Sequence, residues 1–462
     1  MLLESKRTKL CIYILIAIAA LQMLSLLQWL DFKPIIAALG LLMIIFGYDL
    51  LTGSFKKMAG VFFGLGAAIN IYTMQPLSSW IAGINYMLNI SAILVIMQLF
   101  TIPIKLDDYA DTMRYLILRT FKNERSIYIF TLLVTHVFAT FLLFGTMPVM
   151  ISLFGAPLKK IVVDFKRFTS TSLTRSYAMV VSWAPGAVNI LLVINATGAR
   201  WLDMLPLSMC ITVLGLILAY LMHRRYLSVA SLPQYGGENG QQDEVSGHAY
   251  RKIGFICGIA ATLIIVILLF DRLGFGDNTS RVMLASLIVA SLWLASFIGK
   301  PGFKGAMDEY LNINLVKTVD LAVLYVSLGI FSKALEVSGM LNFFYPYVGI
   351  IAGRTGVFIL PVFSMMVFIL SLMGLHPFII LVVLGKIAVS LNLPYTPEVL
   401  SAALLFGATI SYMTSPFAGI VLTAAKFLDA SSYQVGIRWN GLYGLVFFVL
   451  GTIVIMFWGV FM

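Results

Sequence analysis

The sequence predicts an all-α polytopic membrane protein with two inverted-topology repeats, each containing a re-entrant helical hairpin and a broken transmembrane helix. Three observations lead to this prediction. The chain is strongly apolar, with 60% hydrophobic residues and a mean hydropathy of +0.98. Two similar interruptions occur at corresponding places in its two apolar halves. Its basic residues gather in alternate loops, as the positive-inside rule requires.

The composition indicates that a lipid bilayer surrounds most of the chain. A soluble protein of 462 residues does not need so much apolar surface, whereas each spanning helix needs roughly 20 apolar residues. The net charge of +11 is explained by membrane topology, so we expect no nucleic-acid partner. Residues 10–30 form the first apolar run and lack a small-residue cleavage site, which predicts a membrane helix rather than a signal peptide.

Dividing the first half of the chain into apolar runs predicts eight elements. Membrane helices are predicted for residues 10–30, 33–51, 58–72 and 80–104. Residues 105–125 suit a helix lying at the membrane interface, and a plain cytoplasmic loop is the alternative. Residues 126–158 are too long for one span and are interrupted at 145–148, so we predict a re-entrant hairpin. A broken helix (172–195) and a whole helix (201–222) follow.

The second half repeats this order after a polar stretch. Residues 227–250 are rich in Gly, Gln and acidic side chains and predict a flexible linker. Helices are then predicted at 253–270, 282–298 and 318–337, with a lateral segment at 340–353, a hairpin at 356–391, a broken helix at 400–425 and a final helix at 441–461. The predicted domains are N-terminal helices (1–57), a first repeat (58–226), a cytoplasmic linker (227–251) and a second repeat (252–462).

The interruptions form two pairs. Residues 145–148 (Gly-Thr-Met-Pro) match residues 374–377 (Gly-Leu-His-Pro) at a separation of 229 positions. Residues 183–187 (Trp-Ala-Pro-Gly-Ala) match residues 414–418 (Thr-Ser-Pro-Phe-Ala), with their prolines 231 positions apart. Interrupted apolar segments at corresponding places in two halves are the best sequence indication of a secondary transporter and its binding site.

The distribution of basic residues predicts the topology. With a cytoplasmic N-terminus and two re-entrant hairpins, 23 of the 31 basic residues fall in cytoplasmic loops and five fall outside. This arrangement places the C-terminus outside the cell (inner) membrane. The first hairpin then enters from the cytoplasm and the second from outside, so the two halves are inverted.

Candidate binding residues lie at these interruptions. Half-helix ends leave unpaired backbone groups that are tolerated only inside protein or beside a cavity. Positive N-terminal ends suit an anion, and exposed carbonyls suit a cation. The predicted substrate and ion site comprises Gly145, Thr146, Ser182, Gly186, Asn189, Gly374, His376, Thr414, Ser415 and Gly419. No cofactor is expected, and Na⁺ is considered as a coupling ion near Thr146, Asn189, Thr414 and Ser415. For any single hydroxyl the alternative is a bond to its own helix.

Ionisable residues in apolar segments are further candidates. Lys386, on the second hairpin, is predicted to neutralise an anionic substrate or occupy a cation site, and snorkelling to the interface is the alternative. His376 is a candidate proton carrier, against a neutral, hydrogen-bonded ring. For Arg175, Asp320 and His136, the favoured interpretations are a helix end, an interfacial acid and a packing or hydrogen-bonding residue.

Catalytic signatures are absent from the sequence. It has no phosphate-binding loop, no His-Glu-x-x-His and no cysteine pair. The linker is too short for an ATP-hydrolysing domain. We therefore predict a protein that is not an enzyme and that uses an ion gradient or passive transport.

The pattern resembles the ion transporter superfamily, which includes divalent anion/sodium symporters, arsenite efflux proteins and related sodium/proton antiporters. The resemblance covers most of the chain after about residue 58, and residues 328–339 (Leu-Gly-Ile-Phe-Ser-Lys-Ala-Leu-Glu-Val-Ser-Gly) look like a segment common in this group. Thr414-Ser415-Pro416 fits the Thr-Pro type of helix break in the carboxylate symporters, whereas neither hairpin turn contains their Ser-Asn-Thr motif. The resemblance implies an elevator motion and a homodimer.

These observations predict a secondary active transporter of a small, carboxylate-like organic anion, coupled to Na⁺ or H⁺. One alternative is a Na⁺/H⁺ or arsenite-type antiporter, which the scarcity of Asp and Glu in the apolar segments disfavours. Another class is a membrane enzyme or flippase acting on cell-envelope glycans or lipid-linked intermediates. The short outside loops favour transport over such an enzyme.

Overall fold

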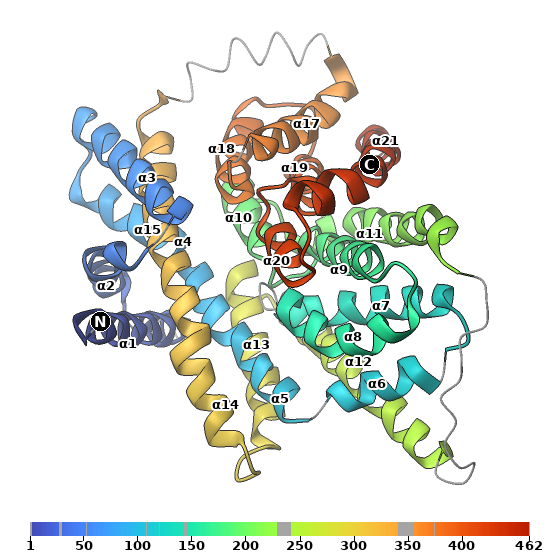
Figure 1. Cartoon of the computed structure of the whole chain (residues 1–462). Helices are drawn as coiled ribbons and strands as arrows, with labels where there is room; N and C mark the ends of the chain where they lie inside the picture. Colours follow the sequence, from blue (N-terminus) through green and yellow to red (C-terminus); the bar gives the residue numbers. More distant parts are fainter. Residues whose placement is uncertain are drawn as a thin grey trace. The chain divides into compact units, whose positions relative to one another are not determined.

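The computed structural model describes residues 2–26, 30–51, 53–107, 109–119, 121–142, 146–228, 242–340, 355–373 and 375–461. It is 86% helical, and the described residues contain no β-strand. Nine helices in these ranges are long and apolar enough to cross a membrane. The predicted class, an all-α multi-pass membrane protein, is therefore confirmed (Figure 1).

The chain divides into two compact units, and each unit takes elements from both halves of the sequence. Unit 1 comprises Met1–Leu106, Ile265–Arg354 and Lys386–Leu393. Unit 2 comprises Asp107–Ile264, Thr355–Gly385 and Pro394–Met462. Helices α12 and α18 each have one end in unit 1 and the other end in unit 2.

Unit 1 is built around the long helices α4 and α15, which pack against each other. Helices α1, α2 and α3 also contact α15, and α13 contacts α4. Burial of consecutive apolar residues on α4 and α15 explains why both helices are apolar around their whole circumference. The helices of unit 1 are α1 (Leu2–Ser25), α2 (Lys33–Gly47), α3 (Gly53–Tyr72), α4 (Leu77–Met97), α5 (Thr101–Leu106), the end of α12 (Gln242–Arg272), α13 (Asn278–Ala295), α14 (Phe303–Glu309) and α15 (Leu315–Val337).

Two helices begin more than ten residues earlier than the sequence predicts. The chain is helical from Phe303 through α14, a π-helical turn (Tyr310–Asn314) and α15, rather than from residue 318. The Tyr310 hydroxyl donates to the Val95 carbonyl at 3.0 Å, and this tertiary bond holds a segment that hydropathy alone rejects. Helix α12 begins at Gln242, inside the predicted linker, because an established helix extends at one hydrogen bond per added residue. Residues 229–241 and 341–354, which hold most of the linker and the lateral segment, lie outside the described residues.

A close backbone contact joins α4 and α15. A Cβ atom on Gly329 would overlap the carbonyl oxygen of Gly83. Gly329→Ala is therefore expected to push the helices apart and to cost about 1–3 kcal/mol in the free energy of unfolding. Gly64→Ala in α3 is the matched control, because a Cβ there meets nothing within 4 Å. Unfolding of both variants in detergent micelles checks this, and equal stability would exclude the close contact.

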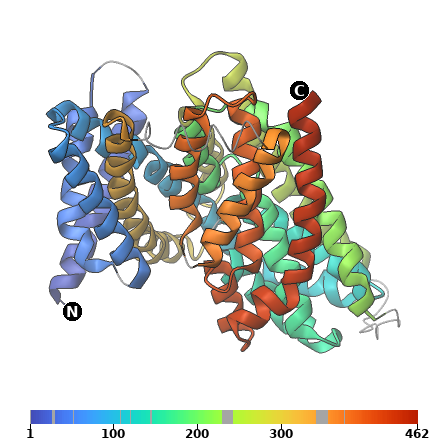
Figure 2. The same ribbon diagram turned by 90° about the horizontal axis from the view of Figure 1, so that it is seen from above.

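Unit 2 contains both hairpins and both broken helices. Helix α19 lies at its centre and contacts α9, α10, α11, α17, α20 and α21 (Figure 2). A shift of 231 positions places the start of α8 on that of α18 and the start of α10 on that of α20, which agrees with the predicted repeat. The helices are α6 (Tyr109–Arg119), α7 (Glu124–Leu142), α8 (Thr146–Ile161), α9 (Phe165–Val181), α10 (Val188–Thr197), α11 (Trp201–His223), the beginning of α12, α17 (Ile359–Leu372), α18 (Pro377–Ser390), α19 (Pro397–Thr414), α20 (Gly419–Phe427) and α21 (Trp439–Phe461).

Proline explains where the new helices begin. Pro377 is the first residue of α18, and Pro148 lies in the first turn of α8. Proline is tolerated in a first turn because the amide hydrogen it lacks would have no helical partner there. The interruptions predicted from sequence thus coincide with real helix starts.

Candidate functional site

A small cavity marks the place where the interrupted segments of unit 2 meet. Its volume is about 10 Å³, close to what one water molecule needs. We call it the central cavity. Among the described residues, no charged side chain lines it. Its lining residues are Ala139, Tyr177, Val180, Val181, Ala187, Val188, Asn189, Phe378 and Tyr412. They come from the first hairpin, both sides of the first break, the start of α18 and the end of α19.

The first break, between α9 and α10, is fixed by aromatic hydrogen bonds. The Trp183 indole N–H donates to His136 Nε2 at 3.1 Å, and the Trp201 indole donates to the Trp183 carbonyl at 2.8 Å. His136 Nδ1 lies 3.2 Å from the Ser176 carbonyl. Because an indole only donates and a carbonyl only accepts, the ring fits as a neutral tautomer with its proton on Nδ1. His136 is thus a hydrogen-bonding residue, as the sequence predicts.

The candidate residues of the first break differ in their roles. The Ser182 hydroxyl donates to the Met179 carbonyl at 2.7 Å and lies 3.2 Å from the Thr212 hydroxyl. Gly186 is buried beside it. Asn189 is only 3% exposed, and its side-chain oxygen accepts a long bond of 3.5 Å from the Tyr412 hydroxyl. Of these residues, only Asn189 presents a polar side chain to the central cavity.

The second break is tied to the second hairpin. The Ser415 hydroxyl donates to the Ser371 carbonyl at 3.0 Å, near the end of α17. The Thr414 hydroxyl donates to the Ile410 carbonyl of its own helix at 2.6 Å. Such a bond is the alternative to ion binding that the sequence predicts for a single hydroxyl. Gly419 begins α20 and is exposed. Gly436 packs so closely on this break that a Cβ would overlap the Thr414 carbonyl oxygen.

The hairpin turns are described in part. Gly145 and Gly374 lie outside the described residues. Thr146 is fully buried at the first residue of α8. The Phe378 N–H donates to His376 Nδ1 at 3.3 Å, so the imidazole caps the start of α18.

Lys386 belongs to a cluster in unit 1. Its ammonium lies 2.8 Å from Glu336 and 4.9 Å from the centre of the Tyr86 ring. Glu336 also pairs with Lys333 at 2.6 Å. Lys386 does not line the central cavity, and an anion reaching this amine would compete with Glu336.

Arg175, which the sequence predicts at a helix end, is a buried cation inside a helix. Helix α9 starts at Phe165, ten residues before Arg175, so Arg175 lies within the helix. Its side chain is buried, and the residue is 3% exposed. Its guanidinium donates to Asn440 Oδ1 at 2.8 Å and to the carbonyls of Trp439 and Ala219 at 3.0 and 3.3 Å, and it lies over the Tyr443 ring. No carboxylate pairs with it in the described part of the chain. The run Thr169–Ser176 is polar and buried, and hydroxyls such as that of Thr174 bond to their own helix carbonyls.

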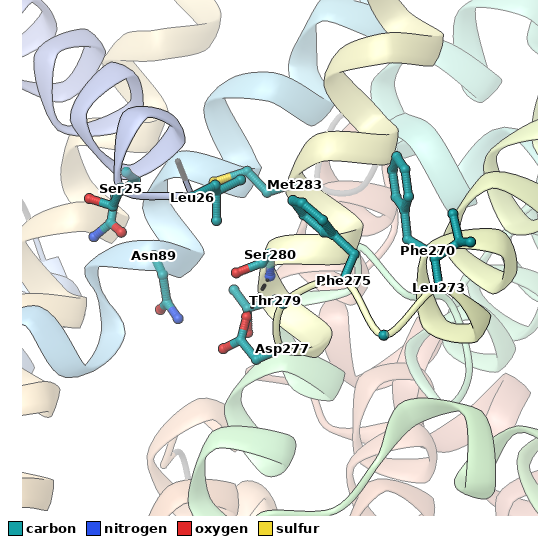
Figure 3. A pocket seen from close by; sticks show the side chains of 13 residues that line it. Ser25, Leu26, Asn89, Phe270, Leu273, Phe275, Asp277, Thr279, Ser280 and Met283 are labelled. Atoms are coloured by element: carbon teal, nitrogen blue, oxygen red, sulfur yellow. Dashed lines mark hydrogen bonds between the residues drawn. The ribbon is translucent and has the colours of Figure 1, made fainter. Parts of the chain in front are cut away.

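A larger cavity lies in unit 1 and contains none of the predicted site residues. Its volume is about 620 Å³, and it is enclosed by α1, α4 and the α12–α13 connection. Figure 3 shows Asn89, Asp277 and Ser25 around it, with Phe270 from the end of α12 and Phe275 from the connection. Arg281 holds this connection through Asp271 and the carbonyls of Phe275 and Gly276, while Asp277 caps α13. Among the polar side chains that line this cavity, Asp277 thus has a structural role.

Comparison with known proteins supports the fold. No protein-family model matches the sequence, and no curated protein matches it. The structure is similar to the crystal structure of the YdaH transporter of Alcanivorax borkumensis, which is described as having an unusual topology. The TM-score is 0.52 and the sequence identity 14%, over 82% of this chain and 85% of that chain. At this identity the similarity establishes the fold alone, so this chain has the helical membrane fold that it shares with YdaH.

Proposed function

We propose that the protein is a secondary active transporter of a small, carboxylate-like organic anion, coupled to Na⁺ or H⁺, with elevator-type alternating access. The observation that carries the proposal is the composition of the central cavity. Two helix starts, α10 and α18, line it, and no charged side chain does. The fold shared with the YdaH transporter supports transport in general.

The start of α10 offers positive potential without a fixed charge. Its N-cap residue, Ala187, makes no side-chain hydrogen bond to the first turn, whereas α18 is capped by His376. Uncapped N–H groups at a helix start carry partial positive charge and bind carboxylates or phosphates well. A carboxylate at Val188 and Asn189 would thus be bound by backbone N–H groups and the Asn189 amide.

The size of the central cavity supports alternating access. A space of about 10 Å³ admits roughly one water molecule, so an organic anion requires movement of the surrounding helices. A permanently open channel would not require such a movement of the helices. The elevator motion, the homodimer and the inner-membrane orientation are parts of the proposal that come from the family resemblance and the charge count.

The coupling ion is proposed from the polar groups of the breaks. The hydroxyls of Thr414 and Ser415 donate to carbonyls and keep lone pairs that suit Na⁺. The central cavity has no carboxylate, which argues against an antiporter built on acidic residues. Uptake into proteoliposomes under an imposed Na⁺ gradient or an imposed pH gradient separates the two couplings.

Asn189→Asp tests the proposed substrate class. A negative charge at the start of α10 is expected to weaken the apparent affinity for an organic anion by about 100-fold, since like charges a few ångströms apart repel strongly at a partly buried site. Asn189→Leu is the matched control, because it removes the amide without adding charge and should have a smaller effect. Uptake of mono-, di- and tricarboxylates is measured per folded protein. Equal transport by wild type and Asn189→Asp would contradict an anionic substrate.

A further inference from the structure

We propose that unit 2 has a second anion site, separate from the central cavity, which binds a phosphate group. The site is a cavity of about 320 Å³ between the start of α9 and the junction of a π-helical segment (Gln434–Arg438) with α21. We call it the basic cavity. It is lined by Asp164, Lys166, Arg167, Gln434, Arg438 and Trp439.

The basic cavity has an excess of positive charge. Three of its side chains are cationic and one, Asp164, is anionic. Asp164 accepts the backbone N–H of Arg167 at 3.2 Å, so part of its hydrogen-bonding capacity is used in capping α9. Lys166 bonds to the Asp429 carbonyl at 2.6 Å and lies 3.4 Å from its carboxylate. Arg438 is exposed and makes no ion pair or side-chain hydrogen bond with any residue that the structure describes.

Arg167 is held against Tyr226, and one of its donors, Nε, lacks a partner among the described residues. Its guanidinium lies over the Tyr226 ring, 3.4 Å from the ring centre. Stacking on an aromatic face fixes the guanidinium plane and leaves its N–H groups to point along that plane. The Nε atom is buried and has no hydrogen-bond partner among the described residues. A phosphate oxygen would satisfy such a donor.

The wall of the basic cavity is preformed. The Trp439 carbonyl accepts from the buried Arg175 at 3.0 Å, and the next residue, Asn440, accepts from Arg175 at 2.8 Å. Gly436, in the π-helical segment, packs against the second break. Such π-helical segments occur frequently at functional sites. A preformed wall reduces the ordering cost of binding.

The chemistry of these groups points to phosphate. A guanidinium fork matches two oxygens of a phosphate, and two such forks with one lysine give charge-assisted bonds from several directions. The apolar helix α21 begins at Trp439, so the basic cavity lies at the end of a membrane helix, where lipid headgroups lie. The phosphate can come from an anionic phospholipid or from solution. The positive-inside rule alone would also place basic residues here. The experiment below distinguishes that explanation from a phosphate site.

The test uses the full chain, purified in detergent and titrated with three probes: phosphatidylglycerol, phosphatidylcholine and inorganic phosphate. Lipid adducts are counted by native mass spectrometry, and inorganic phosphate is followed by calorimetry. Arg438→Gln is expected to weaken binding of phosphatidylglycerol or inorganic phosphate by about tenfold or more, as for loss of a hydrogen bond to a charged group. Arg251→Gln, which removes the same charge from an exposed position outside the basic cavity, should leave binding unchanged.

The outcomes distinguish the sources of phosphate. Selective loss of phosphatidylglycerol in Arg438→Gln supports a lipid headgroup, and selective loss of inorganic phosphate supports a soluble ligand. Lys166→Gln, at another exposed position, replaces Arg438→Gln if that variant does not fold. Equal binding by the cavity variant and Arg251→Gln, or no preference for phosphatidylglycerol over phosphatidylcholine together with no phosphate binding, overturns the proposal. Neither result depends on the transported substrate.

Discussion

Replacing Arg175 by methionine is expected to lower the free energy of unfolding by about 3–5 kcal/mol, because it removes three buried hydrogen bonds from a charged donor. The arginine makes three hydrogen bonds from inside α9, and methionine would leave Asn440 Oδ1 and two carbonyl oxygens without these donors. The change also removes the cation from the Tyr443 ring. An unpaired buried acceptor costs far more than its bond contributes when it is made.

Unfolding in detergent micelles, followed by tryptophan fluorescence, measures this loss. Arg175→Lys should retain part of the stability, because a lysine keeps the charge but not the planar fork. Arg251→Gln, at an exposed position, should change stability by less than about 0.5 kcal/mol. A double-mutant cycle with Asn440→Leu isolates the contact between α9 and α21. Additive effects of the two changes would show that the bond at 2.8 Å contributes nothing to stability.

Replacing Glu124 by glutamine is expected to cost about 2–3 kcal/mol, as for hydrogen bonds to a charged group. Glu124 is 1% exposed at the start of α7, and its two oxygens accept the backbone N–H groups of Val163 and Ser228 at 2.7 and 2.8 Å. These bonds tie α7 to the α8–α9 connection and to the chain after α11. Glutamine has the same shape, but its amide nitrogen would face one of the two donors.

The matched control is Glu309→Gln, which breaks a partly exposed pair with Lys105. Exposed pairs contribute about 0–1 kcal/mol, so this isosteric change should be small in the same unfolding assay. If Glu124→Gln and Glu309→Gln lose equal stability, the two backbone bonds are not the reason for the burial of Glu124.

The central cavity was predictable in part. The helix starts that line it follow from proline and small residues in long apolar runs, which is local information. Asn189 was identified because it lies just after such a break. Tyr177, Tyr412 and Phe378 were missed, because a buried aromatic residue beside a cavity has the same sequence pattern as one in a packed core. Their one local signal is that each lies within eight residues of an interruption.

The sequence by itself determined the class of the protein and the order of its elements. Apolar length, helix-breaking residues and charge distribution are properties of single segments, and they correctly predicted the interruptions between α7 and α8 and between α17 and α18. Only the tertiary structure decided which polar groups are paired. Arg175 meets Asn440 across 265 positions, and Lys386 meets Glu336 across 50, so neither partner is visible in a local window. The physical reason is that burial of a polar residue depends on partners brought together by packing, whereas hydropathy assigns each residue its value alone.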